Sequence, residues 1–354
     1  MSATLIHEPP GSGSATPPAA PAWRAAVARH QRPSVRRAVT QLVTTLPPLA
    51  LALWVMYHSL SLSYWLTLAL ALPTAGFLVR AFIIMHDCAH GSFLPWRRVN
   101  EVIGFVTGVL TLTPFGQWRR DHALHHASSG DLDRRGHGDV ATLTVREYLA
   151  LAPAARLRYR LFRHPAVLLG LGPLHLMVGQ RFRPRSLATG TRQLVSVWAT
   201  NAAIVVGVVA ASLAIGFWPV ALVYFPVMYL AGMAGVWLFY VQHQFEDTYW
   251  QTHEEWDYVT AAIAGSSHFK LPAILRWFTG SIGLHHVHHL GPRIPNYHLQ
   301  RCHDENPLFH GASVVTLRQS AAVMRLALWD EDRQRLVSFG DARRALAAGS
   351  TASA

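Results

Sequence analysis

Long apolar stretches separated by very short links dominate the hydropathy pattern along this chain of 354 residues. An α-helix needs about 20 apolar residues to cross a hydrocarbon layer about 30 Å thick, and four stretches reach that length. They cover residues 39–57, 60–78, 194–217 and 220–241. The link inside each pair contains no Arg or Lys. We therefore expect four membrane-spanning helices arranged as two hairpins.

Arginines indicate which side of the membrane the ends of these spans occupy. They cluster before the first span and after the second, at Arg24, Arg29, Arg32, Arg36, Arg37, Arg97, Arg98, Arg119 and Arg120. Cytoplasmic segments beside spans carry an excess of Lys and Arg. Both termini and residues 79–193 are therefore predicted to be cytoplasmic, in a multi-pass protein of the cell's inner (plasma) membrane.

The pattern outside the spans divides the rest of the chain. Residues 1–38 form a basic leader whose start is rich in Pro, Gly, Ser and Ala and lacks a signal-peptide pattern, so we expect disorder. Residues 39–310 form the membrane domain, and residues 311–354 a cytoplasmic C-terminal helix and tail. Two more apolar segments, 99–115 and 164–180, are short and interrupted by Gly or Pro, which favours interfacial or re-entrant helices.

Composition agrees with a membrane protein. The chain is 51% apolar and only 14% charged, whereas soluble domains average about 25% charged residues. Its net charge is +12, with Lys270 as the only lysine, but the arginines flank apolar segments instead of a nucleic-acid recognition module, so we expect no nucleic acid partner. Cys88 and Cys302 both lie on the predicted reducing side, which favours free thiols.

Histidines carry the candidate chemistry, because they recur at helical spacing in three short segments. Residues three or four positions apart lie on the same face of a helix, so the members of each segment can aim at one point, with His286 directed elsewhere. The three segments contain His86 and His90; His122, His125 and His126; and His285, His288 and His289. A single such pattern is weak evidence, but three in one membrane protein predict metal binding.

Topology adds a ninth histidine and limits the type of metal site. His243 follows the last apolar residues of the fourth span, on the same predicted side as His86 and His90. Nine histidines suit two ions with about five ligands each, although imidazole alone accommodates Zn, Cu, Fe or Ni. A zinc peptidase is excluded because the segment at His86 lacks the glutamate of HExxH. Two redox-active irons beside a bilayer would imply dioxygen activation on a lipid-like substrate.

Four segments resemble those of the membrane fatty acid desaturases. They read HDCAHGSF at 86–93, WRRDHALHH at 118–126, FYVQHQFED at 239–247 and GLHHVHHLGPRIPNYHLQ at 283–300. The resemblance covers about residues 40–310, and the last segment is most similar to bacterial acyl-lipid desaturases of the omega-6 or delta-12 kind. It implies an all-α integral membrane fold, in which four spans lie under a cytoplasmic helical cap with a histidine-rich di-iron site.

The resemblance also implies an activity, a cofactor and partners. The activity is O2-dependent removal of two hydrogens from the acyl chain of a membrane lipid, at two non-haem iron ions. The eight histidines of the three segments match the family's ligands, and His243 occupies the place of an extra ligand. His164-Pro165 does not continue as a haem-binding HPGG motif, so the electrons would come from a separate carrier such as ferredoxin. One departure is Gly291, where asparagine is expected.

Other residues near these segments have candidate roles. Metal-bound imidazoles usually donate their second N–H to a carboxylate or carbonyl, for which the candidate carboxylates are Asp87, Asp121, Asp131, Asp139, Glu246 and Asp247. Four histidines without the box spacing are not expected to be ligands: His253, His268, His298 and His303. Trp118, Trp237 and Tyr240 are candidates for lining an acyl tunnel or for interfacial anchoring, and Cys88 is expected only to pack.

Two other functions remain open at this stage. The same kind of metal scaffold serves membrane hydroxylases and ketolases that act on alkanes or carotenoids, and only the product separates these from a desaturase. A histidine-rich metal transporter is the remoter alternative. Transporters usually place their ligands near the bilayer midplane, whereas the nine histidines here lie at or beyond the ends of the spans.

Overall fold

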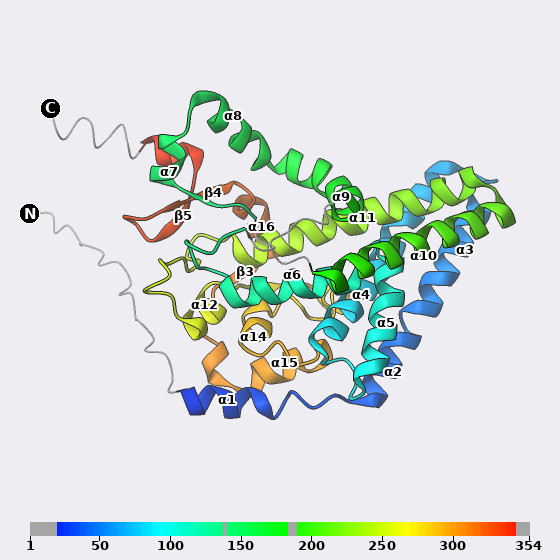
Figure 1. Cartoon of the computed structure of the whole chain (residues 1–354), viewed down its shortest axis with the longest axis horizontal. Helices are drawn as coiled ribbons and strands as arrows, with labels where there is room; N and C mark the ends of the chain where they lie inside the picture. Colours follow the sequence, from blue (N-terminus) through cyan, green and yellow to red (C-terminus); the bar gives the residue numbers. More distant parts are fainter. Residues whose placement is uncertain (1–19, 137–139, 183–189, 345–354) are drawn as a thin grey trace, which may run out of the picture.

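The computed structural model describes residues 20–136, 140–182 and 190–344, and these are predominantly helical (Figure 1). The first two helices, α1 (Ala20–Ala28) and α2 (Val35–Val43), contradict the expectation of a disordered leader over residues 20–38. The backbone N–H of Ser34 donates to the Tyr297 hydroxyl at 3.0 Å, and Trp23 packs against the hydrophobic core. These contacts order the segment although Trp23, Val27 and Val35 are its only apolar side chains larger than alanine or proline. Residues 1–19 lie outside the described residues.

The first hairpin contains the helix that leads to the histidines. α2 and α3 (Leu46–Ser59) together make one span of 25 residues, Val35–Ser59, which is followed by α4 (Tyr64–His90). α4 has 27 residues and continues well past the predicted end of its span, until Gly91 ends it with a φ of 66°. Because α4 is unbroken, its last turns place histidines beyond the apolar segment on a rigid support.

The second hairpin repeats this arrangement. α10 (Thr191–Ile215) and α11 (Phe217–His243) meet at Gly216, whose φ of 88° allows the reversal of the chain direction. Only 11% of the most apolar window of α10 is buried inside the protein, against 56% for α4, so α10 is peripheral and α4 central. The four predicted spans are confirmed as helices long and apolar enough to cross a membrane.

Two bent helix pairs fill the segments predicted to be interfacial or re-entrant. α5 (Arg97–Leu110) and α6 (Phe115–Ser128) meet at 100°, and α8 (Pro153–Phe162) and α9 (Pro165–Phe182) bend by 74°. A bend this large prevents either pair from acting as a single straight span. For α5 and α6, its effect is to bring the histidines of α6 beside those of α4.

The remaining elements form the cap, which we define as residues 244–344, together with β1 and α7. Its helices are α12 (Tyr258–Ala264), α13 (Ala273–Phe278), α14 (His285–Leu290), α15 (Asn296–Glu305), the short η1 (Pro307–Phe309) and α16 (Leu317–Val323), while α7 is Val145–Ala150. Its strands are β1 (Leu143–Thr144), β2 (His268–Lys270), β3 (Val314–Thr316), β4 (Leu326–Asp330) and β5 (Arg335–Ser338). The cap is therefore not purely helical.

Small sheets replace part of the helix expected at the C-terminal end. β4 and β5 pair antiparallel and β1 joins β4 in parallel, while β2 and β3 form a separate parallel pair. Within the described residues, the helical parts of the C-terminal region are the short helix α16 and residues 339–344. β4 reads Leu-Ala-Leu-Trp-Asp and is buried along most of its length, a short apolar run that periodicity cannot distinguish from a helix.

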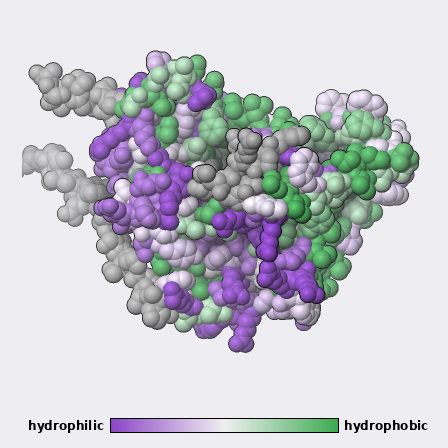
Figure 2. All heavy atoms as spheres, viewed as in Figure 1, coloured by the Kyte–Doolittle hydropathy of each residue, from purple (hydrophilic) through white to green (hydrophobic). Residues whose placement is uncertain are grey.

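Hydrophobic residues gather at one end of the molecule and hydrophilic residues at the other (Figure 2). The hydrophobic end is formed by the far ends of α3, α4, α10 and α11, where Leu213 of α10 is 84% and Trp65 of α4 is 81% exposed. Side chains this apolar and this exposed are expected to face lipid. The cap and both ends of the described chain lie at the other end (Figure 1). Four apolar helices and a polar cap thus agree with a multi-pass membrane protein.

Candidate metal centre

Nine histidines from four helices converge between the spans and the cap. The last turns of α4 carry His86 and His90, and α11 ends at His243. The central turns of α6 and the short helix α14 provide the other members, which are His122, His125, His126, His285, His288 and His289. All nine were predicted from the sequence, and the structure brings all of them together.

The side chains divide into two groups whose nitrogens face one another. In the first group, made of His86, His90, His122 and His288, one ligand nitrogen of each residue lies within 4.8 Å of the others. The second group meets the same distance limit and consists of His125, His243, His285 and His289. The Nε2 atoms of His86 and His288 are 3.0 Å apart, and those of His243 and His285 are 2.9 Å apart.

His126 lies where the two groups meet. Its Nε2 is 3.1 Å from Nε2 of His122 and 3.0 Å from Nε2 of His288, both in the first group. Its ring also stacks on His289 of the second group, with ring centroids 4.2 Å apart. The two groups are therefore immediate neighbours, with His126 added to the first.

The spacing within the second and third sequence segments predicted that each would aim at a single point. In the structure, each of them instead contributes histidines to both groups. Along α6, His122 and His126 lie with the first group and His125 with the second. Along α14, His288 belongs to the first group and His285 and His289 to the second. Positions three apart on a helix differ by about 60° in direction, which is enough to reach two adjacent centres. Each of these helices therefore serves both groups.

Burial keeps these imidazoles in the form that binds metals. His285, His288 and His289 are at most 3% exposed. Burial, reinforced by neighbouring histidines, holds the pKa of each well below its ordinary value, so the rings are neutral near pH 7. A neutral imidazole has one nitrogen free to bind a metal ion.

The donor set fits metal ions better than it fits a hydrogen-bond network. A neutral imidazole donates one proton, and many of these Nε2 atoms face only other Nε2 atoms. Nε2 of His90 is buried without any hydrogen-bond partner among the described residues. A buried polar atom left unpaired is costly, and a cation between the nitrogens would satisfy it.

A buried carboxylate orients the first group. Nδ1 of His86 lies 3.1 Å from Oδ1 of Asp87, which is only 2% exposed. The other carboxylate oxygen accepts hydrogen bonds from the backbone N–H of Asn296 at 2.6 Å and from its side-chain amide at 2.8 Å. Asn296 in turn exchanges hydrogen bonds with Gln41 of α2. This series of hydrogen bonds connects α2 of the first span, α4 and α15 behind one histidine.

A backbone carbonyl orients the second group. Nδ1 of His243 lies 3.1 Å from the carbonyl oxygen of Gly265, at the end of α12. A side chain at Gly265 would meet the carbonyl oxygen of Ala261 at 2.4 Å, so the close turn requires glycine. This interaction fixes which ring nitrogen of His243 points toward the other histidines.

Of the six candidate carboxylates, Asp87 has the predicted role. Asp121 accepts hydrogen bonds from Gln117, Glu246 pairs with Arg335, and Asp247 is exposed. Asp139 lies outside the described residues. The sequence reasoning assigned no role to Asn296 or to the carbonyl of Gly265. Asn296 falls inside the quoted segment 283–300, which was the available signal for it.

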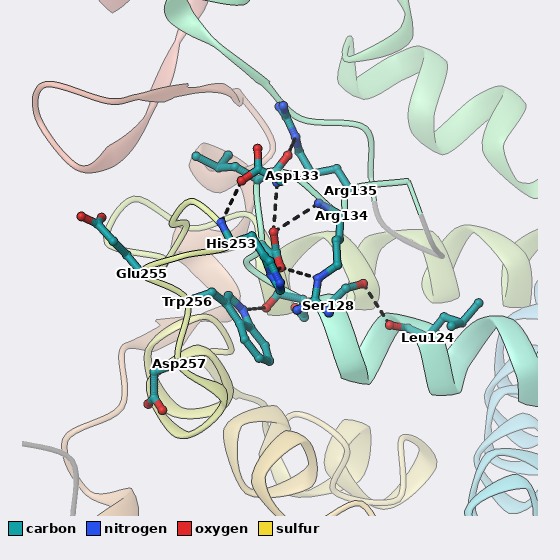
Figure 3. A network of polar contacts seen from close by, with 12 residues as sticks. Leu124, Ser128, Asp133, Arg134, Arg135, His253, Glu255, Trp256 and Asp257 are labelled. Carbon is teal, nitrogen blue, oxygen red and sulfur yellow. Dashed lines mark hydrogen bonds and ion pairs between the residues drawn. The ribbon is translucent and has the colours of Figure 1, made fainter.

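Asp131 belongs to a separate network that joins two loops beside the centre (Figure 3). Its buried carboxylate contacts Arg134 and Nδ1 of His253, and Trp256 donates from Nε1 to the carbonyl of Ser129 at 2.9 Å. Burial would raise the pKa of the Asp131 carboxyl, but these hydrogen bonds hold it below its usual range. The network fastens the loop after α6 to the segment that precedes α12.

The histidines that were not expected to be ligands lie outside both groups. His253 pairs with Asp131, His298 contacts the carbonyl of His30, and Nδ1 of His303 lies 3.2 Å from Nε2 of His286. Cys88 packs in the hydrophobic core, as predicted. At Gly291, an added Cβ would lie 2.7 Å from the terminal methyl of Ile294.

Aromatic residues lie one helical turn before three of the clustered histidines. Trp118 stacks on His122 with ring centroids 4.3 Å apart, and it also contacts Phe82 and His86 of α4. Phe239 lies 5.2 Å from the ring of His125 and 5.3 Å from that of His243. Two other aromatic side chains pack away from the centre: Trp237 against Phe269, and Tyr240 against Arg163 and Leu326.

Comparison with known proteins agrees with this geometry. The chain is 45% identical over 315 residues to a fatty acid desaturase of Bacillus subtilis, an alignment that covers 88% of this chain and 89% of that one. It is 29% identical to an endoplasmic-reticulum omega-3 fatty acid desaturase of Vigna radiata over 78% of this chain and 73% of the other. A chloroplastic omega-6 desaturase of Brassica napus is 25% identical, over 68% and 54%. A sequence model of the fatty acid desaturase family matches residues 59–319, and the chain belongs to this family of oxidoreductases.

Proposed function

We propose that this protein introduces a double bond into the acyl chain of a membrane lipid, using O2 and two iron ions held by the nine clustered histidines. The observation that supports the proposal best is the presence of two adjacent groups of buried imidazoles beside membrane-spanning helices. Two ions would share the nine ligands, five from the first group with His126 and four from the second. When bound, the iron pair supplies the redox chemistry that O2-dependent dehydrogenation requires.

The chain's own residues would position the substrate and exclude water. Phe82, Trp118 and Phe239 form apolar surfaces next to the histidines, and α4 and α11 approach the centre from the apolar end of the molecule. A methylene chain has no polar group to bind, so contact with such rings is the interaction available to hold it. Asp87 and the Gly265 carbonyl would keep His86 and His243 in their ligand orientation.

We further propose that the histidine side of the membrane is cytoplasmic and that a separate protein such as ferredoxin delivers the electrons. Two features support this orientation: the arginines that flank the first hairpin, and the position of the cap beside both ends of the described chain. Cytoplasmic reductants would then reach the centre from the cap side without crossing the membrane.

The direct test is expression in a bacterium supplied with defined saturated fatty acids, followed by mapping of double bonds in its lipids. We expect a new double bond with the wild-type chain and none with His125→Ala or His288→Ala. The first variant removes a ligand from the second group, and the other removes one from the first group. His253→Ala is the matched control, since this partly exposed histidine lies outside both groups. A new hydroxyl or keto group in place of the double bond would identify a hydroxylase or ketolase. Full activity and iron content in His125→Ala would contradict the ligand assignment.

A further inference from the structure

A cavity of about 260 Å³ lies beside the metal centre, on the cap side of α4. β2, α13 and α15 surround it, and residues 279–284 close the remaining wall. The polar side chains that matter for its chemistry are His268, Lys270, Arg276, Gln300, His303 and Asp304. A water molecule occupies about 30 Å³ in the liquid, so the cavity has room for a polar group of several heavy atoms.

Local structure explains why these side chains share one space. Side chains alternate along a strand, so His268 and Lys270 of β2 lie on one face while Phe269 packs into the core on the other. On α15, Gln300, His303 and Asp304 are separated by three and four positions and therefore lie on one helical face.

The cavity has a net positive charge. Arg276 donates to Oε1 of Gln300 at 3.0 Å, and Gln300 donates to Oδ1 of Asp304 at 2.9 Å. The Gln300 amide therefore connects the Arg276 guanidinium to the Asp304 carboxylate. Lys270 has no hydrogen bond or ion pair with any described residue, which leaves its ammonium free. Burial lowers the pKa of His268 to about 4, so this ring is neutral near pH 7. Two cations against one carboxylate leave one positive charge.

The cavity also lies at the edge of the membrane-spanning region. α13, which carries Arg276, packs against α4, and Phe77 of α4 contacts Trp277 with ring centroids 5.9 Å apart. The outer face of α13 is apolar and accessible, with Ile274 67% and Trp277 39% exposed. On the opposite side, the cavity wall continues through Gly283 and Leu284 directly into His285 of the second group.

We propose that this cavity binds a phosphate group, carried by the headgroup of the acyl lipid whose chain enters the metal centre. The inference rests on the proposed function, because it places the polar end of the same substrate. A phosphodiester carries one negative charge, which balances the net charge of the cavity. Lys270 supplies a mobile ammonium and Arg276 a guanidinium, and both groups bind phosphate oxygens well. The hydroxyl of Ser281 is a further donor in the lining.

The single lysine makes the proposal testable without any mutation. Purified full-length protein in neutral detergent is treated with an amine-acylating reagent, and peptide mapping by mass spectrometry follows the modification of Lys270 separately from that of the N-terminal amine. We expect phosphatidylglycerol to slow acylation of Lys270 several-fold, whereas diacylglycerol with the same chains leaves it unchanged. Acylation of the N-terminal amine is the internal control for reagent loss.

Three outcomes would each overturn the proposal or one part of it. Lack of protection by phosphatidylglycerol would overturn the proposal, and equal protection by a fatty acid carboxylate would overturn its phosphate chemistry. Protection by inorganic phosphate without protection by lipid would overturn the headgroup assignment. Because the assay needs no turnover, its result is independent of double-bond formation. Failed protection of the purified protein, combined with new double bonds in the expressing host, removes this proposal alone. Intact protection without any new lipid product removes only the proposed function.

A matched pair of variants locates the binding site. Arg276→Gln removes a cavity cation but keeps a hydrogen-bonding side chain, and we expect it to raise the lipid concentration for half-protection about tenfold. Arg293→Gln removes one positive charge from an exposed residue outside the cavity lining and should change this value little. Equal shifts in the two variants would show that general electrostatic attraction, and not the cavity, holds the lipid.

Discussion

The two histidine groups are built from the same residue type but are held in place differently. In the first, Nδ1 of His86 contacts the carboxylate of Asp87, which accepts hydrogen bonds from Asn296. In the second, Nδ1 of His243 contacts the backbone carbonyl of Gly265. A carboxylate partner makes an imidazole more basic and offsets part of a cation's charge, whereas a carbonyl mainly fixes its orientation. The comparison indicates that two ligand sets built from histidine alone need not hold their ions equally.

The sharpest way to break the comparison is to remove one ligand from each group. We expect His86→Ala and His243→Ala each to reduce desaturation to background, because each leaves one ion with an incomplete ligand set. Iron content per purified chain and double bonds in host lipids are the measurements. His164→Ala, outside both groups, is the control. Retention of the full iron content by either variant would remove that residue from the ligand set.

Replacing Asp87 by Asn tests the carboxylate alone. The amide keeps the size of the side chain but loses its charge, and we expect iron affinity to fall about 10–100-fold. The loss should appear in iron titration of the apoprotein as a higher iron concentration at half-saturation. Asp121→Asn is the matched control, since this carboxylate also precedes a clustered histidine but accepts hydrogen bonds from Gln117. Equal effects in the two variants would contradict the role given to Asp87.

Gly265→Ala tests the carbonyl of the second group and should have a smaller effect. The added methyl would meet the Ala261 carbonyl at 2.4 Å, so the turn must shift and take its carbonyl away from His243. We expect activity to fall by about tenfold at most, because the ring itself remains. Gly235→Ala on α11 is the control, since nothing lies near its new methyl. An effect larger than that of Asp87→Asn would show that the Gly265 carbonyl contributes more to its group than the Asp87 carboxylate contributes to its own.

The smallest expected effect concerns stability and pH. Asp131 has a pKa below its usual range in the folded protein, so its contribution to stability is present above the unfolded value of about 3.9 and is lost as pH falls through the folded value. Asp131→Asn should lower the free energy of unfolding by about 1 kcal/mol near pH 7. The difference from wild type should disappear once the pH lies below the folded pKa of Asp131, and thermal denaturation across pH measures it. A difference that stays constant with pH would contradict this origin.

The sequence predicts the spans and the nine histidines well because both depend on local, periodic information. A run of about 20 apolar residues and a spacing of three or four positions are visible without any knowledge of tertiary contacts. The order of residues 20–38 was missed because it depends on the distant partner Tyr297, which contacts Ser34 and Arg37. The strands β4 and β5 were missed because they are short and stabilised by pairing with each other and with β1.

The division of ligands between two groups was beyond sequence reasoning for a related reason. Helical spacing says that His122, His125 and His126 lie on one face of α6, but not how two centres divide that face. The same limit applies to Asp87, whose neighbours among the candidate carboxylates looked equally suitable. Its contact with Asn296, 209 positions away, is what distinguishes it.

Because α6 and α14 each present histidines to both groups, we expect the binding of two ions to be coupled. An ion in one group would fix two helices that also carry ligands for the other. The second ion would then bind to helices that are already ordered, so its binding would lose less conformational entropy. Such coupling is reciprocal and makes loading cooperative. We therefore expect iron uptake by the apoprotein to be sigmoidal, with little protein carrying a single ion at any stage.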